Sequence, residues 1–456
     1  MKRDIPQPFG IDEIRFRHCF SAPSYRIFVA LVIGWVLTVG QHTVSRVILT
    51  ARLHEDRHFA TIYRFLKKGR WETDWVSESL FRILVETLIA DGYEVLVVVD
   101  DTLNKHRGKE ICGAGWQHDG SVPKQGKKAK QTGYGVCFVI IGLAVRLPGI
   151  SDRVFCLPYA ARLWWPEKAK VKPEGLRYKT KPQLALDLIN LTHSWIAGRK
   201  HLRIVADLAY CCETVLKGRP KGVHLTGRMK PSSALFGLLE APTVRRRGRP
   251  RKKGKRLPTP AAMFQDPNLN WSHVTVFCYG KDIKLLFHQF TAVWYHSAGP
   301  TPISVVLCRD PAGKYADTVF FDTDSTASAK DIVERYGSRW SIEITNRETK
   351  QLLGSADPQC RKENCVIRAP MFAYWAYSFV ILWFVRRFST AKNLVAEPAP
   401  WYRQKKNFTF SDMLAAARRS HFHIGISSKP REINALPKFN KTRCARHIDH
   451  TRIAKL

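Results

Sequence analysis

The chain has 456 residues, more than one hydrophobic core usually organises, and 45% of them are hydrophobic, which is ample for packed cores. This composition excludes a chain that is disordered throughout. The 74 lysines and arginines exceed the 38 acidic residues by 36 charges, an excess that opposes compact folding through self-repulsion. A polyanionic partner explains it most simply, with nucleic acid as the leading class and an anionic membrane surface as the alternative.

Two uncharged runs test the membrane alternative. They cover residues 27–40 and 369–385, and both are shorter than the roughly 20 residues of a membrane-spanning helix. We therefore expect two buried helices and no membrane partner. The N-terminal sequence MKRDIPQPFG has no apolar stretch after its charges, so no signal peptide is expected and the predicted location is the cytoplasm.

The 11 cysteines fit that compartment, because they are odd in number, scattered, and contain no Cys-x-x-Cys pair. We expect reduced, buried thiols and no disulfide framework. The nearest approach to a zinc pattern is Cys444, His447 and His450, which lacks a convincing fourth ligand.

Residues 1–90 are predicted to be helical. Apolar residues at helical spacing form a stripe flanked by basic side chains, with Val44, Val47, Ile48 and Leu53 in the stripe and Arg46, Arg52, Arg57 and Arg64 beside it. Short helices with basic faces suit a DNA-binding domain. A helical cap packed on the next domain has nearly equal weight, because helix-turn-helix spacing is degenerate in sequence.

The first candidate site residues follow an apolar strand at residues 95–99. Asp100 and Asp101 come directly after it, as expected when a buried strand delivers a carboxylate at its end, although a helix cap or turn would give the same pattern. Residues 105–130 are rich in Gly and Lys and are predicted to form a mobile basic loop, in which Lys105 and Lys109 could contact DNA phosphates.

The pattern then repeats. Strands are predicted at 134–145 and 154–159, a helix at 182–197, and a second apolar strand at 202–206 that ends in Asp207. Strands that alternate with a crossover helix predict a mixed α/β sheet. Two aspartates that follow strands of one sheet can converge on one edge of it.

A β-rich, basic insertion is expected after this sheet. Strand-like runs occur at 274–279, 283–287, 291–295, 303–308 and 318–321. They follow the basic run of residues 244–256, in which Arg247 and Arg249 belong to an Arg-Gly-Arg-Pro sequence like that of an AT-hook. Such a segment places arginines in a narrow minor groove, and a flexible basic loop that only contacts phosphates is the alternative.

One helix is predicted to run through residues 336–350, after a capping box formed by Ser328 and Asp331. Its functional face would carry Tyr336, Arg339, Glu343 and Lys350. Taken alone, this face could be an ordinary salt-bridged, solvated surface. Together with Asp100 and Asp207, however, Glu343 completes a set of carboxylates suited to hold two divalent metal ions for phosphodiester cleavage, with the cations gripping phosphates.

The spacing Tyr-x2-Arg-x3-Glu-x6-Lys, intact at Tyr336, Arg339, Glu343 and Lys350, resembles the signature of bacterial DDE transposases of the insertion-sequence-4-like superfamily, especially the insertion-sequence-701-like branch. The resemblance spans roughly residues 46–385. It implies an RNase H-like catalytic domain interrupted by a β-strand insertion, with Asp207 as the second catalytic acid. The first acid is Asp100 by the family pattern, with Asp101 as the alternative.

The resemblance also implies cofactors and partners. Two Mg²⁺ ions are expected at Asp100, Asp207 and Glu343, with Mn²⁺ able to substitute. The expected substrates are double-stranded DNA carrying terminal inverted repeats and target DNA, bound by a homodimer that holds two ends together. Relatives use a tryptophan of the insertion in DNA hairpin formation; Trp271 and Trp294 are candidates, and whether hairpins form is left open.

The sequence therefore predicts an α/β protein, with these parts: a helical DNA-binding domain (1–90), an RNase H-like catalytic domain in two segments (91–225 and 301–390), a basic β-rich insertion (226–300) and a basic C-terminal region (391–456) with an amphipathic segment at 410–419. Two other functions remain open. One is a catalytically silent DNA-binding regulator, and the other is an RNase H-like nuclease that acts on other DNA structures.

Overall fold

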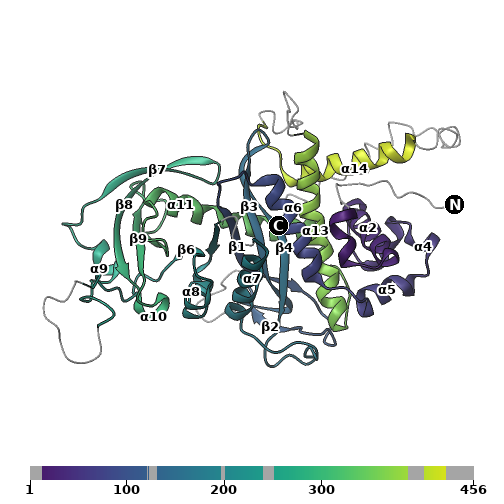
Figure 1. The fold of residues 1–456 in the computed structure, drawn as a ribbon, viewed down its shortest axis with the longest axis horizontal. Helices are drawn as coiled ribbons and strands as arrows, with labels where there is room; N and C mark the ends of the chain where they lie inside the picture. The colour runs from purple at the N-terminus through teal and green to yellow at the C-terminus, as the bar shows by residue number, and fades with distance from the viewer. Residues whose placement is uncertain are drawn as a thin grey trace.

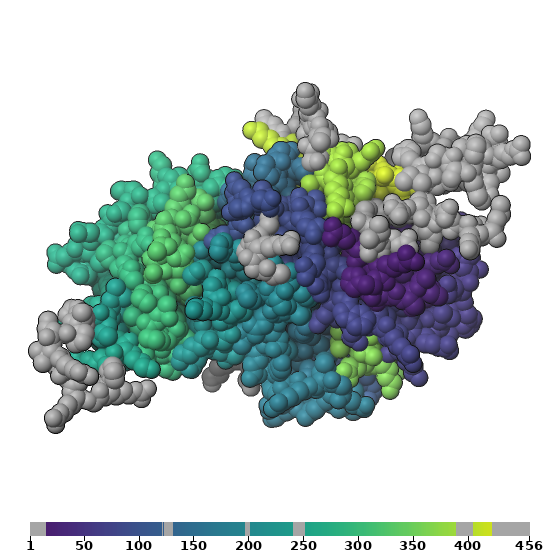
Figure 2. Space-filling model, viewed as in Figure 1, coloured from purple at the N-terminus to yellow at the C-terminus, as the bar shows by residue number. Residues whose placement is uncertain are grey.

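The computed structural model describes residues 13–120, 122, 131–196, 201–239, 251–388 and 405–427. The AT-hook-like arginines Arg247 and Arg249, and the Cys444, His447 and His450 group, lie outside the described residues. Figure 2 shows the N-terminal helices at one end of the molecule and the later strands at the other.

A single mixed sheet organises the described part of the chain. Its strands are β1 (Val95–Lys105), β2 (Gly115–His118), β3 (Thr132–Leu147), β4 (Ser151–Trp164), β5 (Leu202–Ala206), β6 (His224–Arg228), β7 (Ser272–Cys278), β8 (Lys281–Val293), β9 (Pro302–Arg309) and β10 (Thr318–Asp322). They are arranged in the order β2-β3-β1-β5-β6-β10-β9-β8-β7, and β4 also pairs with β3. The pairs β1–β5 and β5–β6 are parallel and the others are antiparallel, so the predicted mixed α/β sheet is confirmed.

Helices flank this sheet. They are α1 (Glu13–Phe16), α2 (Ala22–Leu37), α3 (Val44–Thr50), α4 (Leu53–Asp56), α5 (Phe59–Lys68), α6 (Thr73–Leu88), α7 (Lys181–Ile196), α8 (Glu213–Gly218), α9 (Pro260–Phe264), α10 (Tyr295–Ala298), α11 (Ala329–Ser338), α12 (Trp340–Leu352), α13 (Glu363–Phe388) and α14 (Phe410–Ser427), with 3-10 turns at Arg17–Cys19 and Leu208–Tyr210. Figure 1 shows α13 between the sheet and the N-terminal helices.

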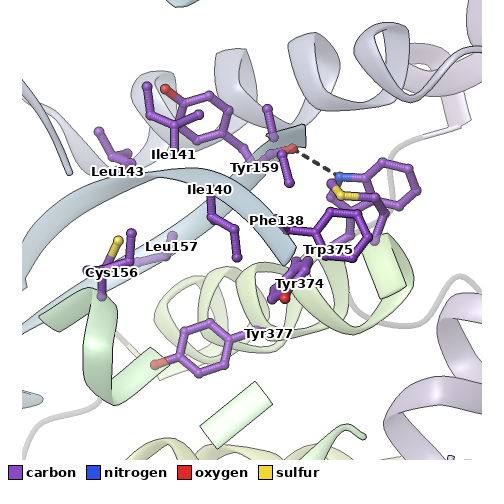
Figure 3. Close-up of a cluster of buried hydrophobic side chains, with 14 of the residues drawn as sticks. Phe138, Ile140, Ile141, Leu143, Cys156, Leu157, Tyr159, Tyr374, Trp375 and Tyr377 are labelled. Carbon is purple, nitrogen blue, oxygen red and sulfur yellow. Dashed lines mark hydrogen bonds between the residues drawn. The ribbon is translucent and has the colours of Figure 1, made fainter. Parts of the chain in front are cut away.

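The core is built on both faces of β3 and β4. Figure 3 shows Phe138 and Ile140 directed toward α13, whose Trp375 donates its indole N–H to the carbonyl of Tyr159 at 3.0 Å. On the other face, the Tyr159 hydroxyl lies 2.8 Å from the hydroxyl of Thr192 on α7. The long apolar strands are therefore covered on both sides, which is why they show continuous runs of buried residues.

The predicted buried helices are confirmed. Among the described residues, α13 alone is long and apolar enough to cross a membrane by length and composition, and 94% of its most apolar window is buried inside the protein. Helix α2, which holds the other uncharged run, packs on α13 and is buried along most of its length. Both runs are core helices because each is covered by other elements of the chain.

The N-terminal helices share this core. The predicted apolar stripe is buried at Val44, Val47 and Ile48. The indole N–H of Trp35 donates to the carbonyl of Leu353 at 3.0 Å, which links α2 to the end of α12. This packing is what the helical-cap alternative requires, while a DNA-binding domain at residues 1–90 stays a prediction.

Several local predictions are wrong. Residues 105–130 are not entirely loop, because β2 lies within them and pairs with β3. The runs 283–287 and 291–295 are not two strands, because no turn residue separates them: β8 continues through both to Val293, and Tyr295 already begins α10. A disulfide joins Cys360 and Cys365, so these thiols are not reduced, whereas the other described cysteines are free and most are buried.

Candidate active site

The parallel ladder between β1 and β5 brings two of the predicted acids together. Its last paired residues are Val99 and Ala206, so Asp100 and Asp207 are the next residues on two adjacent strands. Adjacent strands lie about 4.8 Å apart, and residues at matching positions of a parallel pair point to the same side. The prediction that β1 ends at these acids is wrong, because the strand continues to Lys105 along β3. Asp100 and Asp207 lie close together because each follows the last paired residue of the parallel β1–β5 ladder.

Asp100 and Asp101 point to opposite faces of the sheet, since successive side chains of a strand alternate. Asp100 pairs across the ladder with Ile140, which faces α13, and Asp101 pairs with Val139. Asp101 is held on the α7 face, where it accepts hydrogen bonds from Lys181 Nζ at 2.6 Å and Tyr210 Oη at 2.7 Å. Only Asp100 therefore shares a face with α12, the helix that carries Glu343.

The helix through the predicted signature is divided at Arg339. This residue ends α11 and precedes α12, and the backbone N–H of Arg339 donates to the carbonyl of Tyr336 in a tight, three-residue turn. The hydroxyls of Ser338 and Ser341 each donate to the carbonyl three residues earlier, at 2.5 and 2.7 Å. The predicted helix over residues 336–350 is therefore interrupted only at Arg339, whose own backbone is helical, and it continues as α12. The capping by Ser328 is confirmed, because its hydroxyl accepts from the N–H of Asp331.

Arg339 lies among the acids. Its guanidinium donates to Glu343 Oε1 at 2.7 Å, and another of its nitrogens lies 3.9 Å from Asp100 Oδ2. Arg339 also interacts electrostatically with Asp207. Its side chain is only 13% exposed, so these interactions are poorly screened by water. One buried cation therefore links the three predicted catalytic acids.

The electrostatics of Asp100 are dominated by burial. Burial and the neighbouring charge of Asp101 raise the pKa of Asp100 to about 7, and the charge of Glu343 acts in the same direction. The backbone N–H of Asp101 and the Arg339 guanidinium oppose this rise. Asp100 is thus an acid that changes its charge close to neutral pH.

Tyr336 lies at the same site. Its hydroxyl donates to Asp207 Oδ1 at 3.4 Å, and its ring packs on Phe320 with centroids 5.0 Å apart. Burial raises the pKa of Tyr336 to about 12, against the opposing charge of Arg339, so the phenol keeps its proton at neutral pH. Tyr336 can therefore donate a hydrogen bond to Asp207 or to an oxygen that takes its place.

A divalent metal fits the chemistry of these donors. Hard divalent cations prefer carboxylate oxygens, and Asp100, Asp207 and Glu343 supply them around a buried position with a positive charge already in it. Among the described residues, no group of three or more His, Cys, Asp or Glu side chains is close enough to hold a metal ion as the side chains stand. The Arg339 guanidinium lies between the carboxylates, so metal binding would require it to move.

Of the remaining predicted cations, Lys350 interacts electrostatically with Asp100, but its hydrogen-bond partner lies elsewhere. Lys350 is largely buried, and its Nζ donates to the carbonyl of Leu103 on β1 at 2.9 Å. Burial lowers the pKa of Lys350. Lys105 forms an ion pair with Asp119 at 2.8 Å, and Lys109 is exposed in the turn region after β1. A contact of any of these lysines with DNA stays a prediction.

Residues that the sequence analysis did not select also border the site. A cavity of about 330 Å³ is lined by Arg228, Tyr279, Tyr315 and Tyr336, among others. Tyr279 is 57% exposed and stands at the β7–β8 turn with φ of 57°, where most hairpins place Asn, Asp or Gly. A tyrosine at that turn position is a sequence signal for function, because it costs backbone strain.

The two tryptophans proposed for the insertion are packed inside it. Trp294 is 8% exposed and lies edge-on to Phe321, with ring centroids 5.2 Å apart. Trp271 stacks on Phe264, and the Arg309 guanidinium lies over it at 4.8 Å. Neither borders the carboxylates, whereas Tyr279 interacts electrostatically with Arg339 and Glu343.

Carboxylates on two adjacent strands and on one covering helix of a mixed sheet suit metal-dependent cleavage of phosphodiesters. The chain belongs to the DDE superfamily endonucleases, because the sequence profile of that family matches residues 15–279, more than half of the chain. The matched segment contains Asp100 and Asp207 and ends before Glu343.

Two further comparisons add little to this assignment. Among solved structures, the chain is similar to one described as a cryo-EM structure of a piggyBac transposase synaptic complex with hairpin DNA. The similarity covers 93% of this chain and 74% of that chain at 9% sequence identity, with a TM-score of 0.40, too low to establish a shared fold. No curated protein matches the chain.

Proposed function

We propose that this DDE superfamily endonuclease is the transposase of a bacterial insertion sequence, of the insertion-sequence-4-like superfamily and its insertion-sequence-701-like branch. It would bind the terminal inverted repeats of its element, cut the DNA there and join the free ends to target DNA. The observation that carries the proposal is the linkage of Asp100, Asp207 and Glu343 through Arg339 at the end of the parallel strands.

In the proposed site, Asp100, Asp207 and Glu343 would hold two Mg²⁺ ions, or Mn²⁺ in their place. When bound, such ions supply activation of the attacking water or 3′-hydroxyl and charge stabilisation of the leaving oxygen. Asp100 is chosen over Asp101 because Asp101 is already bonded to Lys181 and Tyr210 on the other face. Asp100 would have to be ionised to act as a ligand, which its pKa of about 7 makes possible at neutral pH.

The signature cation and phenol would act on the DNA. Arg339 would exchange its bond to Glu343 for a phosphate oxygen at the cut, since guanidinium groups bind phosphate and carboxylate in the same way. Tyr336, which keeps its proton, would donate to a phosphate oxygen from beside Asp207. Both would orient the scissile phosphate, Arg339 after it has moved from between the carboxylates.

The organisation that we propose follows the sequence analysis: an RNase H-like catalytic domain, a basic β-rich insertion before Glu343, an N-terminal DNA-binding domain and a homodimer that holds two ends. Cytoplasmic action on chromosomal DNA is part of the proposal. The insertion strands are continuous with the catalytic sheet, because β8 of the insertion pairs directly with β9, which pairs with β10. Insertion and catalytic strands would therefore move as one unit.

The test is cleavage of duplex DNA that carries the inverted repeats flanking the gene, by the purified full-length protein with Mg²⁺. Glu343→Gln keeps the shape of the side chain and removes its charge, and should abolish cleavage at the element end. The matched control is Glu348→Gln on the same helix, whose carboxylate accepts from the Tyr377 hydroxyl at 3.0 Å and faces away from the acids. This control should cleave at nearly the parental rate.

The outcomes separate the alternatives. Equal cleavage by the parent and Glu343→Gln would remove Glu343 from the chemistry and contradict the proposal. Binding without cleavage by either protein would favour a silent regulatory derivative. Cleavage that ignores the inverted repeats and prefers branched DNA would favour a nuclease of another kind.

A further inference from the structure

A second basic site lies at the opposite end of the parallel strands from the acids. It is a pocket of about 570 Å³ formed around α8, the start of β6 and the end of α10, which lie side by side in Figure 1. The described residues that line it include no Asp or Glu, whereas its cationic or potentially cationic side chains are Lys217, Arg219, Lys221, His224 and Lys252. A concave surface with one sign of charge concentrates anions.

The pocket is separate from the candidate active site. His224 at the pocket pairs with Arg203 near the start of β5, whereas Asp207 follows the end of that strand. At about 3.3 Å per residue, these two positions lie roughly 13 Å apart along the sheet. A phosphate bound in the pocket therefore cannot be the phosphate that is cut at Asp207.

Arg219 and His224 contribute polar nitrogen atoms to the pocket. Arg219 is held in place by donating to the carbonyls of Leu216 and Val223. Burial lowers the pKa of Arg219, and the charge of Asp322 is what opposes this. The Nδ1 atom of His224 is buried and has no hydrogen-bond partner. An anion in the pocket would place a negative charge near Arg219 and offer an acceptor to His224 Nδ1 when that atom carries the ring proton.

A basic segment is fixed at the mouth of the pocket. Lys253 lies over the ring of Phe236 at 3.7 Å and near that of Tyr295 at 5.0 Å. The backbone of Gly254 donates to the carbonyl of Gly237 at 3.0 Å. These contacts hold the neighbouring Lys252 beside the pocket, so the charge of Lys252 has a defined place there.

We propose that this pocket binds the phosphodiester backbone of duplex DNA at a position outside the cleavage site. The inference relies on the proposed function only in taking DNA as the polyanion. Lys221 and Lys252 are exposed and form no ion pair among the described residues, while Lys217 is paired with Glu213 at 2.6 Å. Free phosphate has the same charge chemistry, but the pocket is larger than one phosphate needs, and its cations come from separate segments that suit an extended backbone.

The test is the salt dependence of binding to a fluorescein-labelled 30-base-pair duplex of arbitrary sequence, measured by anisotropy with full-length protein. The variant Lys221→Ala/Lys252→Ala should lower the slope of log affinity against log salt by roughly 2, because each phosphate contact contributes about 0.9. At 0.1 M salt its affinity should fall at least about tenfold. Lys221→Arg/Lys252→Arg keeps the charges and should bind as the parent does.

The matched control is Lys168→Ala/Lys172→Ala, which removes the same charge from exposed lysines after β4 and away from the pocket. Its slope should change much less. Equal slopes for the pocket variant and this control would overturn the proposal, because the effect would then be one of net charge. Stabilisation of the parent by inorganic phosphate alone, lost in the pocket variant without any change in DNA slope, would also overturn it and assign the pocket to a small anion.

Cleavage separates this inference from the proposed function. If the protein cleaves at the inverted repeats, the pocket variant at saturating DNA should cleave at the parental rate while needing more DNA to reach it. A reduced maximal rate at saturating DNA would place the pocket in the chemistry and contradict a remote contact. If no protein cleaves but the slopes differ as expected, the proposed function fails and the DNA pocket stands.

Discussion

The two faces of β1 treat neighbouring carboxylates in different ways. On the α7 face, Asp101 is bonded to Lys181 and Tyr210, and the Cys137 thiol lies 3.5 Å away. On the α12 face, Asp100 accepts from one backbone N–H and has Arg339 only at 3.9 Å. The charge of Asp101 is balanced by bonded partners, whereas Asp100 has few partners and is open to a ligand. Availability, rather than acidity alone, distinguishes a candidate metal ligand from a structural residue.

The largest expected effect is that of Asp100→Asn. This substitution keeps the shape of the side chain and removes the charge that a metal ligand needs, so cleavage of inverted-repeat DNA should fall by at least about a thousandfold. Folding should be preserved, because burial already favours the uncharged form of Asp100. Single-turnover cleavage with Mg²⁺ and circular dichroism measure the two properties. Cleavage within tenfold of the parent would show that Asp100 is not the available acid.

The second expected effect is on pH dependence. Without metal the pKa of Asp100 is about 7, so protonation should compete with metal binding, and cleavage at subsaturating Mg²⁺ should fall as pH drops below that value. Stability should run the other way. Without divalent metal, the raised pKa of Asp100 stabilises the fold at low pH, and this contribution is lost as pH rises through about 7.

Urea denaturation in EDTA at pH 5 and pH 8 tests the stability part of this prediction. The free energy of unfolding of the parent, relative to that of Asp100→Asn, should be larger at pH 5 than at pH 8. An unchanged difference between the two proteins would mean that Asp100 does not titrate in this range. Any fall in cleavage at low pH would then have to be explained by another group.

The third expected effect concerns Asp101, on the opposite face of β1. Asp101→Asn leaves Lys181 without its charged partner, and it should destabilise the protein by about 1–2 kcal/mol, a moderate value because both side chains are about a quarter exposed. Urea denaturation at pH 7 measures this loss. Cleavage at saturating Mg²⁺ should change far less than in Asp100→Asn. A loss of cleavage equal to that of Asp100→Asn, with stability intact, would exchange the roles of the two residues.

The sequence was sufficient for what depends on local pattern. The continuous apolar runs at 95–99 and 202–206 predicted two neighbouring buried strands, and the acids that follow them predicted their convergence. The choice between Asp100 and Asp101 could not be made in that way, because it depends on which helix covers which face of the sheet. The extension of β1 was missed for a similar reason: Asn104 is buried, and its amide donates to the carbonyl of Ser355, far away in the chain.

Local hydrogen bonds accompany the interruption of the helix at Arg339. The residues around Arg339 include no proline to mark a break, and the hydroxyls of Ser338 and Ser341 donate to carbonyls of the preceding turn. Sequence spacing alone places Tyr336, Glu343 and Lys350 on one straight face. In the structure Arg339 also lies beside Asp100, while Lys350 reaches Leu103 on β1. The spacing predicted that Arg339 lies one turn before Glu343, but it could not predict the bond of Lys350 to Leu103.

The smallest expected effect concerns Lys350, because its cation is already used inside the protein. Lys350→Met removes the donor to the carbonyl of Leu103 and should destabilise the protein by about 1 kcal/mol. The salt dependence of DNA binding should change little. The comparison is Lys109→Met, an exposed lysine whose loss should lower the slope by roughly 1 if it contacts a phosphate. Lys350→Met and Lys109→Met lowering the slope of log affinity against log salt equally would mean that Lys350 leaves Leu103 when DNA binds. The distinction between bonded and available charges would then apply only to the DNA-free protein.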